Sequence, residues 1–183
     1  MGRKLTSYSN KPTSVEESCQ GSVVSEKEKG TGERETAMDP RAKMYFDEVQ
    51  EGMLLPPATY GPMDRYKYIP IAVILRDMNP LHLDRVYAHE RGMPDVVQQG
   101  PLNETYLYRF LTDWLHRPWD IRKTKLRFAA NVFPDDLLTC GGTVTRKYRE
   151  NGEPRVDCQV WQQNHKGESI LFGEATFTLP EKK

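Results

Sequence analysis

The sequence predicts an α+β domain in which an antiparallel sheet packs against one long helix. Two observations lead to this prediction. The clearest helical spacing of apolar residues lies between Gly100 and Trp114. After Pro118 the pattern changes to short strand-like segments joined by turn signals such as Asn151-Gly152. A single long helix followed by a run of neighbouring strands is typical of a sheet that carries the helix on one face.

The first 43 residues differ in composition from the rest of the chain. They are rich in Ser, Thr, Gly, Lys and Glu, and the stretch 25–35 contains no apolar side chain. Such a segment cannot bury enough apolar surface to offset the entropy of ordering it, roughly 1–2 kcal/mol per residue. We therefore expect a disordered tail over residues 1–43 and one folded domain over residues 44–183.

Short secondary-structure elements are expected in the first part of the domain. Residues 46–54 indicate a leading strand or turn, and the Pro56-Pro57 pair that follows indicates a break. Residues 69–75 are apolar and begin beside a proline, which favours a short helix. Residues 84–91 predict a second short helix, which ends at Gly92.

The long helix begins at Gly100-Pro101, and its apolar positions recur every three or four residues. These positions are Leu102, Tyr106, Leu107, Phe110, Leu111 and Trp114. Four strands are then expected, over residues 123–132, 137–148, 156–161 and 170–179.

Charge and cysteine content exclude several classes of protein. The chain has 26 Lys and Arg against 26 Asp and Glu, which argues against a nucleic-acid binder or a protein held on anionic membranes. Its three cysteines form no CxxC pair, so we expect neither a disulfide framework nor a metal site. No apolar run approaches the roughly 20 residues of a membrane span, and we expect a cytoplasmic protein.

The residues with the clearest chemical meaning lie in the segment 76–84. It places Asp77 and His82 five residues apart, across an Asn79-Pro80 turn. Because proline disfavours a helix at the preceding residue, the chain must leave the first short helix near Asp77. Such a turn can direct both side chains toward one water molecule, an arrangement that suits general acid–base catalysis.

A second element is the amino end of the long helix, at Gln99-Gly100-Pro101. Backbone N–H groups there have no partner within the helix and carry the positive end of its dipole. Gly100 has no side chain to block close approach. A thioester carbonyl placed against its N–H would be stabilised as it gains negative charge.

These segments resemble the MaoC-like family of (R)-specific enoyl-CoA hydratases and acyl dehydratases. Residues 77–84, Asp-Met-Asn-Pro-Leu-His-Leu-Asp, look like the family's hydratase motif. Gly100-Pro101-Leu102 falls where the family has a His-Gly-Met-Leu or His-Gly-Pro-Leu segment. Residues 127–139 are similar to the strand–turn–strand that follows it. The likeness extends from about Phe46 to Pro180.

The resemblance implies a hot-dog fold, in which a curved antiparallel sheet surrounds the central helix, and usually a dimer. It also implies an acyl-thioester substrate such as an acyl-CoA, with no metal or redox cofactor. Asp77 and His82 would activate the water, and the Gly100 N–H would polarise the thioester carbonyl. The reaction would interconvert 2-enoyl and 3-hydroxyacyl thioesters.

Three further residues are candidates for substrate contact. Asn79 is expected to form the turn and to position the dyad. Gln99 stands where relatives commonly have histidine, and Tyr108 stands where short-chain relatives often have a small hydroxyl residue. A tyrosine there would shorten or reshape an acyl pocket, although core packing is the simpler explanation for the aromatic side chains of this helix.

Two alternative functions use other features of the sequence. A hot-dog thioesterase would use Glu104 or Asp113 on the central helix as its carboxylate. A non-catalytic hot-dog subunit would complete the binding groove of a heteromeric partner, and Gln99 and Tyr108 are the departures that favour it.

Overall fold

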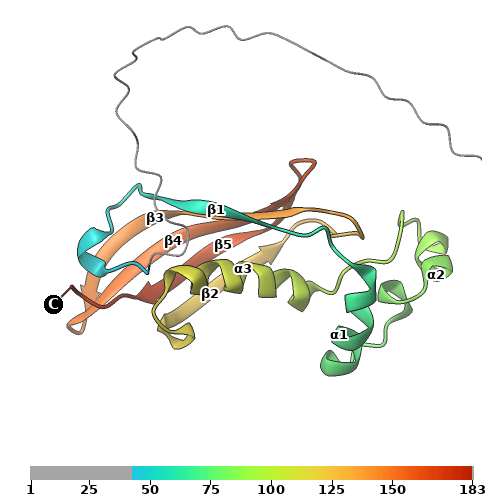
Figure 1. Ribbon diagram of the computed structural model, residues 1–183, viewed down its shortest axis with the longest axis horizontal. Coiled ribbons are helices and arrows are strands. Elements are labelled where there is room, and N and C mark those ends of the chain that lie inside the picture. Colours follow the sequence, from blue (N-terminus) through green and yellow to red (C-terminus); the bar gives the residue numbers. More distant parts are fainter. Residues whose placement is uncertain (1–42, 183) are drawn as a thin grey trace, which may run out of the picture. The chain divides into compact units, whose positions relative to one another are not determined.

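A computed structural model of the chain describes residues 43–182 (Figure 1). The predicted tail therefore lies outside the described residues, except for Lys43. The helices are α1 (Tyr68–Leu75), α2 (Arg85–Glu90) and α3 (Gly100–Trp114), with single 3₁₀ turns at Phe46–Glu48, Arg65–Lys67, Pro80–His82 and Pro118–Asp120. The strands are β1 (Leu54–Tyr60), β2 (Ile121–Phe128), β3 (Leu138–Glu150), β4 (Glu153–Asn164) and β5 (Ser169–Thr178).

The strands form one antiparallel sheet in the order β1-β3-β4-β5-β2, and α3 lies along one face of it (Figure 1). The β3–β4 connection is the hairpin that the sequence predicts at Asn151-Gly152, and β4 and β5 are joined by a second hairpin that turns at Gly167. Asn151 and Gly152 both adopt positive φ, of 52° and 82°, as a tight hairpin turn requires. The α+β fold class is confirmed.

The core lies between α3 and the inner face of the sheet. The helix contributes residues at helical spacing, among them Leu107, Phe110 and Leu111, each exposed by no more than 1%. Along β4, buried Val156, Cys158 and Val160 alternate with less buried residues, as expected for a strand with one face in the core. Burial therefore fixes which face of the sheet α3 covers.

Two predicted boundaries differ from the structure for identifiable reasons. Pro56 and Pro57 do not end the first strand but lie inside β1, where the register to β3 shifts between Leu55 and Ala58. Proline is tolerated there because β1 is an edge strand. At the other edge, β2 ends at Phe128 rather than at residue 132, and the Val132 carbonyl instead accepts a hydrogen bond from Gln98 N at 2.8 Å.

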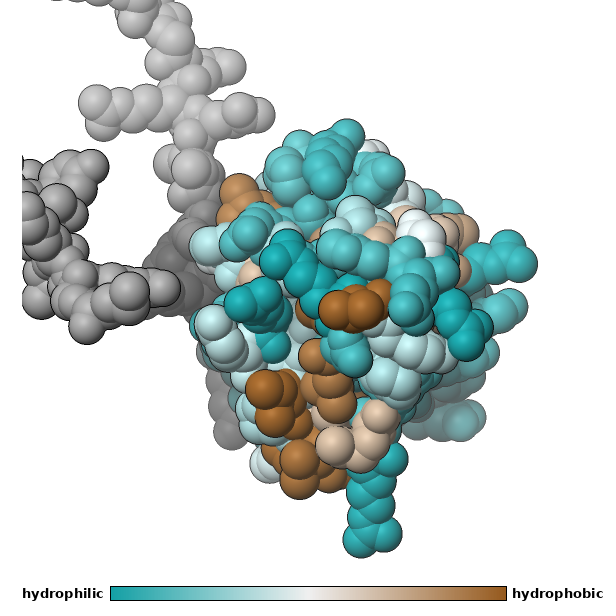
Figure 2. Space-filling model, turned by 90° about the vertical axis from the view of Figure 1, so that its right-hand side faces the viewer, coloured by the Kyte–Doolittle hydropathy of each residue, from teal (hydrophilic) through white to brown (hydrophobic). Residues whose placement is uncertain are grey.

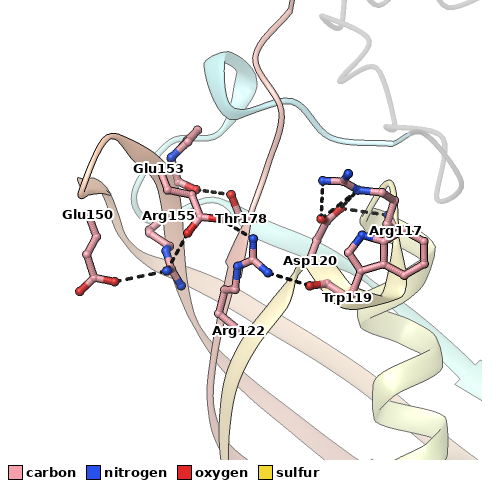
Figure 3. A network of polar contacts seen from close by, with 9 residues as sticks. Arg117, Trp119, Asp120, Arg122, Glu150, Glu153, Arg155 and Thr178 are labelled. Carbon is pink, nitrogen blue, oxygen red and sulfur yellow. Dashed lines mark hydrogen bonds and ion pairs between the residues drawn. The ribbon is translucent and has the colours of Figure 1, made fainter.

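Charged side chains connect several elements at one end of the sheet (Figure 3). Arg122 on β2 donates to the Trp119 carbonyl at 3.0 Å and pairs with Glu153, which Arg155 also contacts at 2.7 Å. The side chain of Asp120 is fully buried. It accepts hydrogen bonds from three donor atoms of Arg117, namely the backbone N, Nε and Nη2. These contacts hold the start of β2 against the β3–β4 hairpin.

Within residues 43–182, none of the helices combines the length and the apolar character needed to cross a lipid bilayer.

Candidate functional site

The end of α1 sets the position of Asp77. Arg76 adopts a left-handed conformation with φ of 55°, which ends the helix, and Asp77 N still donates to the Ala72 carbonyl at 2.9 Å. The next turn is closed by Asn79, whose side-chain oxygen accepts from Leu81 N at 3.0 Å. Asn79 therefore caps the 3₁₀ turn that carries His82, the turn-forming role that the sequence predicts.

Asp77 and His82 come together across this turn. His82 Nε2 lies 3.4 Å from Asp77 Oδ2, and the side chains are exposed by 13% and 43% respectively. His82 Nδ1 lies 2.7 Å from the Val97 carbonyl oxygen. Because a carbonyl can only accept, Nδ1 must carry a proton, and Nε2 is the nitrogen left for acid–base chemistry toward Asp77.

Residues 97–99, the extended segment that leads into α3, are fixed by hydrogen bonds to other elements. Val97 N donates to the Leu81 carbonyl at 3.0 Å, so both polar backbone groups of Val97 contact the turn that carries His82. The fully buried Gln99 side chain donates through Nε2 to the Tyr68 carbonyl on α1 at 3.0 Å. The segment thus connects the histidine, the helix that precedes Asp77 and the start of α3.

Gly100 begins α3, one residue after this anchored segment. Its N–H has no acceptor among the described residues, because intrahelical bonds to N–H groups begin only in the next turn and Pro101 contributes no N–H. A methyl group added at Gly100 would lie 3.4 Å from the Phe128 ring. The Phe128 ring therefore lies close to the start of α3, where a side chain at Gly100 would contact it.

Buried amide side chains pack behind the amino end of α3. Gln98 Nε2 donates to Asn103 Oδ1 at 2.6 Å, and Gln162 Nε2 on β4 donates to the Asn103 carbonyl at 3.1 Å. All three residues are exposed by 3% or less. No local sequence pattern predicts this cluster, because Gln162 lies 59 residues from Asn103 and single amide side chains carry no periodic signal.

Other residues named from the sequence lie farther along α3. The Tyr108 hydroxyl contacts Thr124 Oγ1 of β2 at 2.8 Å, eight residues and therefore about 12 Å along the helix from Gly100. Glu104 is one turn from Gly100 and half-buried, whereas Asp113 is exposed near the opposite end of α3. Of the two carboxylates considered for a thioesterase, Glu104 is therefore the one in the first half of α3.

A hollow of about 200 Å³ adjoins His82, and its lining includes Arg65, Tyr66 and Ile69. A larger hollow of about 740 Å³ lies over Trp161 and Phe172, whose side chains alternate with core residues and so occupy the sheet face away from α3. The larger hollow contains neither member of the dyad. The smaller hollow is lined by His82 but not by Asp77 or Gly100.

An acid–base pair with an assigned tautomer is thus connected, through residues 97–99, to a helix N-terminus with a free N–H. Such an arrangement is able to move protons next to a polarised carbonyl. Residues 59–163 match the profile of the MaoC like domain. The chain belongs to the MaoC-like dehydratase family, and its fold is the hot-dog fold.

Solved structures agree with this assignment at the level of fold. The unliganded R-hydratase PhaJ1 from Pseudomonas aeruginosa superposes with a TM-score of 0.67 at 24% identity, covering 76% of this chain and 88% of that one. A MaoC-like dehydratase from Rhodospirillum rubrum gives 0.67 at 20% identity, with coverages of 76% and 99%. The ChsH1-ChsH2 complex from Mycobacterium tuberculosis gives 0.60 at 21%, with coverages of 72% and 98%. No curated protein sequence matches the chain.

Proposed function

We propose that the protein catalyses the reversible addition of water to a trans-2-enoyl thioester, giving a 3-hydroxyacyl thioester. The observation that carries the proposal is the contact of 3.4 Å between Asp77 Oδ2 and His82 Nε2, with His82 Nδ1 committed to the Val97 carbonyl. A water molecule that lies alongside the pair, in contact with both side chains, would meet an acceptor and a group able to return a proton. Membership of the MaoC-like family supports the reaction class.

In the forward direction the water oxygen forms a bond to C3 of the enoyl group while one member of the dyad takes a proton from the water. The electron pair of the double bond moves toward the thioester carbonyl, whose oxygen gains negative charge against the Gly100 N–H. The dyad then delivers a proton to C2, and the charge on oxygen returns to the carbonyl. No electron is gained or lost, so the reaction written in this way requires no redox cofactor.

Substitution of the dyad tests the proposal. Purified protein is incubated with short- and medium-chain trans-2-enoyl-CoAs, and loss of the conjugated enoyl absorbance is followed. Asp77→Asn and His82→Ala should each lower kcat by about 10²–10⁴-fold, the usual contribution of a positioned acid or base. Both side chains are partly exposed, so circular dichroism should show an intact fold. Rates close to those of the parent protein in either variant would reject the assignment.

A second candidate is a hot-dog subunit that acts together with a paralogous partner. The resemblance to a complex of two different chains, ChsH1 and ChsH2, favours it, as does the buried position of Gln99 where relatives commonly have histidine. Co-purification of a second hot-dog chain, with turnover only in the mixture, would support this assignment. Turnover by the isolated chain that depends on Asp77 and His82 would exclude it.

Release of free thiol from an acyl-CoA, without a 3-hydroxy product, would instead indicate a thioesterase using Glu104.

A further inference from the structure

The hollow of about 740 Å³ on the outer face of the sheet, which we call the sheet hollow, is not used by the candidate active site. Its lining comes from β2, β4 and β5 alone, three neighbouring strands that carry α3 on their other face (Figure 1). Small-molecule sites enclose about 300–1,000 Å³. The sheet hollow therefore has the size of a ligand site.

The floor of the sheet hollow is aromatic. The strand register sets Trp161 of β4 opposite Phe172 of β5 and, on its other side, opposite Gly141 of β3. A Cβ built on Gly141 would overlap the indole atoms Cζ2, Cε2 and Cη2 of Trp161. The indole thus lies across the Gly141 backbone and leaves its other face toward the hollow. Flat aromatic faces on a sheet are surfaces on which planar bases stack.

Long polar side chains surround this aromatic floor. The register sets Arg127 of β2 opposite Phe172, and sets Glu174 of β5 between Lys125 of β2 and Gln159 of β4. All four polar side chains are exposed. In the described part of the chain, neither Lys125 nor Arg127 forms an ion pair within 4.0 Å. Both cations are therefore available to a ligand.

The charge on this face of the sheet is positive. Lys125 and Arg127 line the sheet hollow against one carboxylate, that of Glu174. The adjoining hollow on the same face adds three cations and two carboxylates, namely Arg122, Lys123, Arg155, Glu150 and Asp157. Glu153 pairs with two of these cations, Arg122 and Arg155. Cations outnumber carboxylates even with Glu153 included, so the sheet hollow complements a planar ligand that carries negative charge.

We propose that the sheet hollow binds a nucleoside phosphate. The base stacks on the free face of Trp161, beside Phe172. The phosphate pairs with Arg127 and Lys125, and the planar guanidinium of Arg127 is able to donate two parallel hydrogen bonds to it. The sugar hydroxyls donate to the carboxylate of Glu174. Each of these contacts is made on the outer face of the sheet, so the inference does not depend on the proposed function.

A second copy of the chain is the competing occupant, and the shape of the surface opposes it. A two-fold contact through this face would set hollow against hollow. Such a contact would enclose a void where a stable interface is closely packed. A small ligand fills the concave surface without that cost.

The exposed apolar side chains of α1 form a different kind of surface. Ile69, Val73 and Ile74 are exposed by 55%, 62% and 73%, and Figure 2 shows apolar side chains gathered at this end of the molecule. Charges of both signs border them, namely Asp64, Arg65, Lys67, Arg76, Asp77 and Asp95. Charge therefore selects no single partner at α1, whereas the sheet hollow combines an aromatic floor with unpaired cations.

Isothermal titration calorimetry of the full chain with ADP and with adenosine tests the proposal. We expect ADP to bind with a dissociation constant on the order of 100 µM, and adenosine, which lacks the phosphates, to bind about tenfold more weakly. Trp161→Leu should weaken the binding of both at least tenfold. Arg127→Gln should weaken ADP to the level of adenosine and leave adenosine unchanged.

Two matched controls should bind as the parent protein does. Trp119→Leu removes a tryptophan that is exposed by 65% and lies outside the hollow. Arg91→Gln removes an exposed arginine that follows α2. Circular dichroism checks the fold of Trp161→Leu. Because Arg127 is exposed on β2, the loss of ADP preference in Arg127→Gln remains a test even if Trp161→Leu fails to fold.

The same variants distinguish two sources of the nucleoside phosphate. If it is the nucleotide end of coenzyme A, CoA should displace ADP and Arg127→Gln should raise KM for crotonyl-CoA severalfold. If it is a free nucleotide, KM for crotonyl-CoA should not change in Arg127→Gln. Either result supports the inference, provided that ADP binding depends on Trp161 and Arg127.

Three results would overturn the inference. The first is the absence of ADP binding at millimolar concentration, or binding that neither variant changes. The second is self-association without ADP binding, seen by light scattering and lost in Trp161→Leu, which would assign the hollow to a second copy. The third is a single-stranded oligonucleotide that binds far more tightly than ADP through the same residues, which would assign the face to nucleic acid. Hydration of crotonyl-CoA by the parent protein is unaffected by any of the three.

Discussion

The imidazole of His82 is oriented by backbone rather than by another side chain. Val97 supplies the carbonyl that holds Nδ1 at 2.7 Å, and its own N–H is held by Leu81. A backbone carbonyl can only accept a hydrogen bond and does not titrate. The tautomer of His82 therefore does not depend on the protonation of a neighbouring side chain. The acid–base behaviour of the pair is therefore left to His82 Nε2 and Asp77.

Substitution of Gly100 tests whether the substrate approaches the start of α3 without disturbing the fold. A Cβ at this position would meet the Phe128 ring at 3.4 Å, an ordinary contact, and the backbone there does not require positive φ. Gly100→Ala should therefore fold normally. Its methyl group would occupy the space beside the free N–H, and we expect kcat/KM for enoyl-CoA to fall by about 10²-fold. Thermal unfolding checks the fold, and an unchanged kcat/KM would mean that the thioester carbonyl does not approach Gly100.

The buried thiols and phenols make stability sensitive to alkaline pH. Burial raises the pKa of Cys140 to about 11, that of Cys158 to about 12, and that of Tyr60 to about 12. Thiols in the unfolded chain titrate near pH 8.5 and phenols near pH 10. Above these values the unfolded chain releases protons that the folded chain retains, so the free energy of unfolding should decrease as pH rises, until the folded groups titrate in turn.

Urea unfolding at about pH 7, 9 and 10.5 measures this effect. The midpoint should fall with each step, and the Cys140→Ala, Cys158→Ala double variant should show a shallower fall. A midpoint that does not change between the first and last pH would contradict the burial of these groups.

At the scale of elements, the sequence predicts most of what surrounds the site. The helical spacing from Leu102 to Trp114 predicts α3 because the residues that pack on the sheet are the apolar ones. The motif from Asp77 to His82 predicts the dyad because a local turn is sufficient to bring the two side chains together. In contrast, the partners of residues 97–99 come from distant segments, and a backbone carbonyl such as that of Val97 leaves no trace in the sequence.

Gln99 is the side chain that connects two elements of the site. Its amide donates to the Tyr68 carbonyl and ties α1, which precedes Asp77, to the start of α3. We expect Gln99→Leu to remove this hydrogen bond between α1 and the start of α3 and to lower the free energy of unfolding by about 1 kcal/mol. Because the role is one of position, kcat should fall while KM for enoyl-CoA changes little.

Histidine at this position provides the control for Gln99. Its ring can donate one hydrogen bond, as the Gln99 amide does, so Gln99→His should recover most of kcat and of the unfolding midpoint. If Gln99→Leu raises KM and leaves kcat unchanged, or if Gln99→His recovers nothing, the residue acts by another route, such as direct contact with the substrate.

At the scale of the whole molecule, the two edges of the sheet are not equivalent. The β1 edge contains Pro56 and Pro57 and a shift of register, features that block pairing with a further strand. The β2 edge has no proline over Ile121–Phe128 and leaves one row of backbone groups without a strand partner in the described chain. Pairing of two copies through β2 would satisfy these groups and continue the sheet.

We therefore expect a dimer whose contact lies at β2. Light scattering at micromolar concentration should give twice the mass of the chain, and Ile74→Ser on α1 should not change that mass. A proline introduced at Lys125, in the middle of β2, should shift the mass toward that of one chain. Circular dichroism would show whether the sheet survives this substitution.

Loss of the dimer should also lower turnover, because Phe128 at the end of β2 packs beside Gly100. We expect turnover to fall together with the measured mass. A monomer with full activity would contradict both expectations.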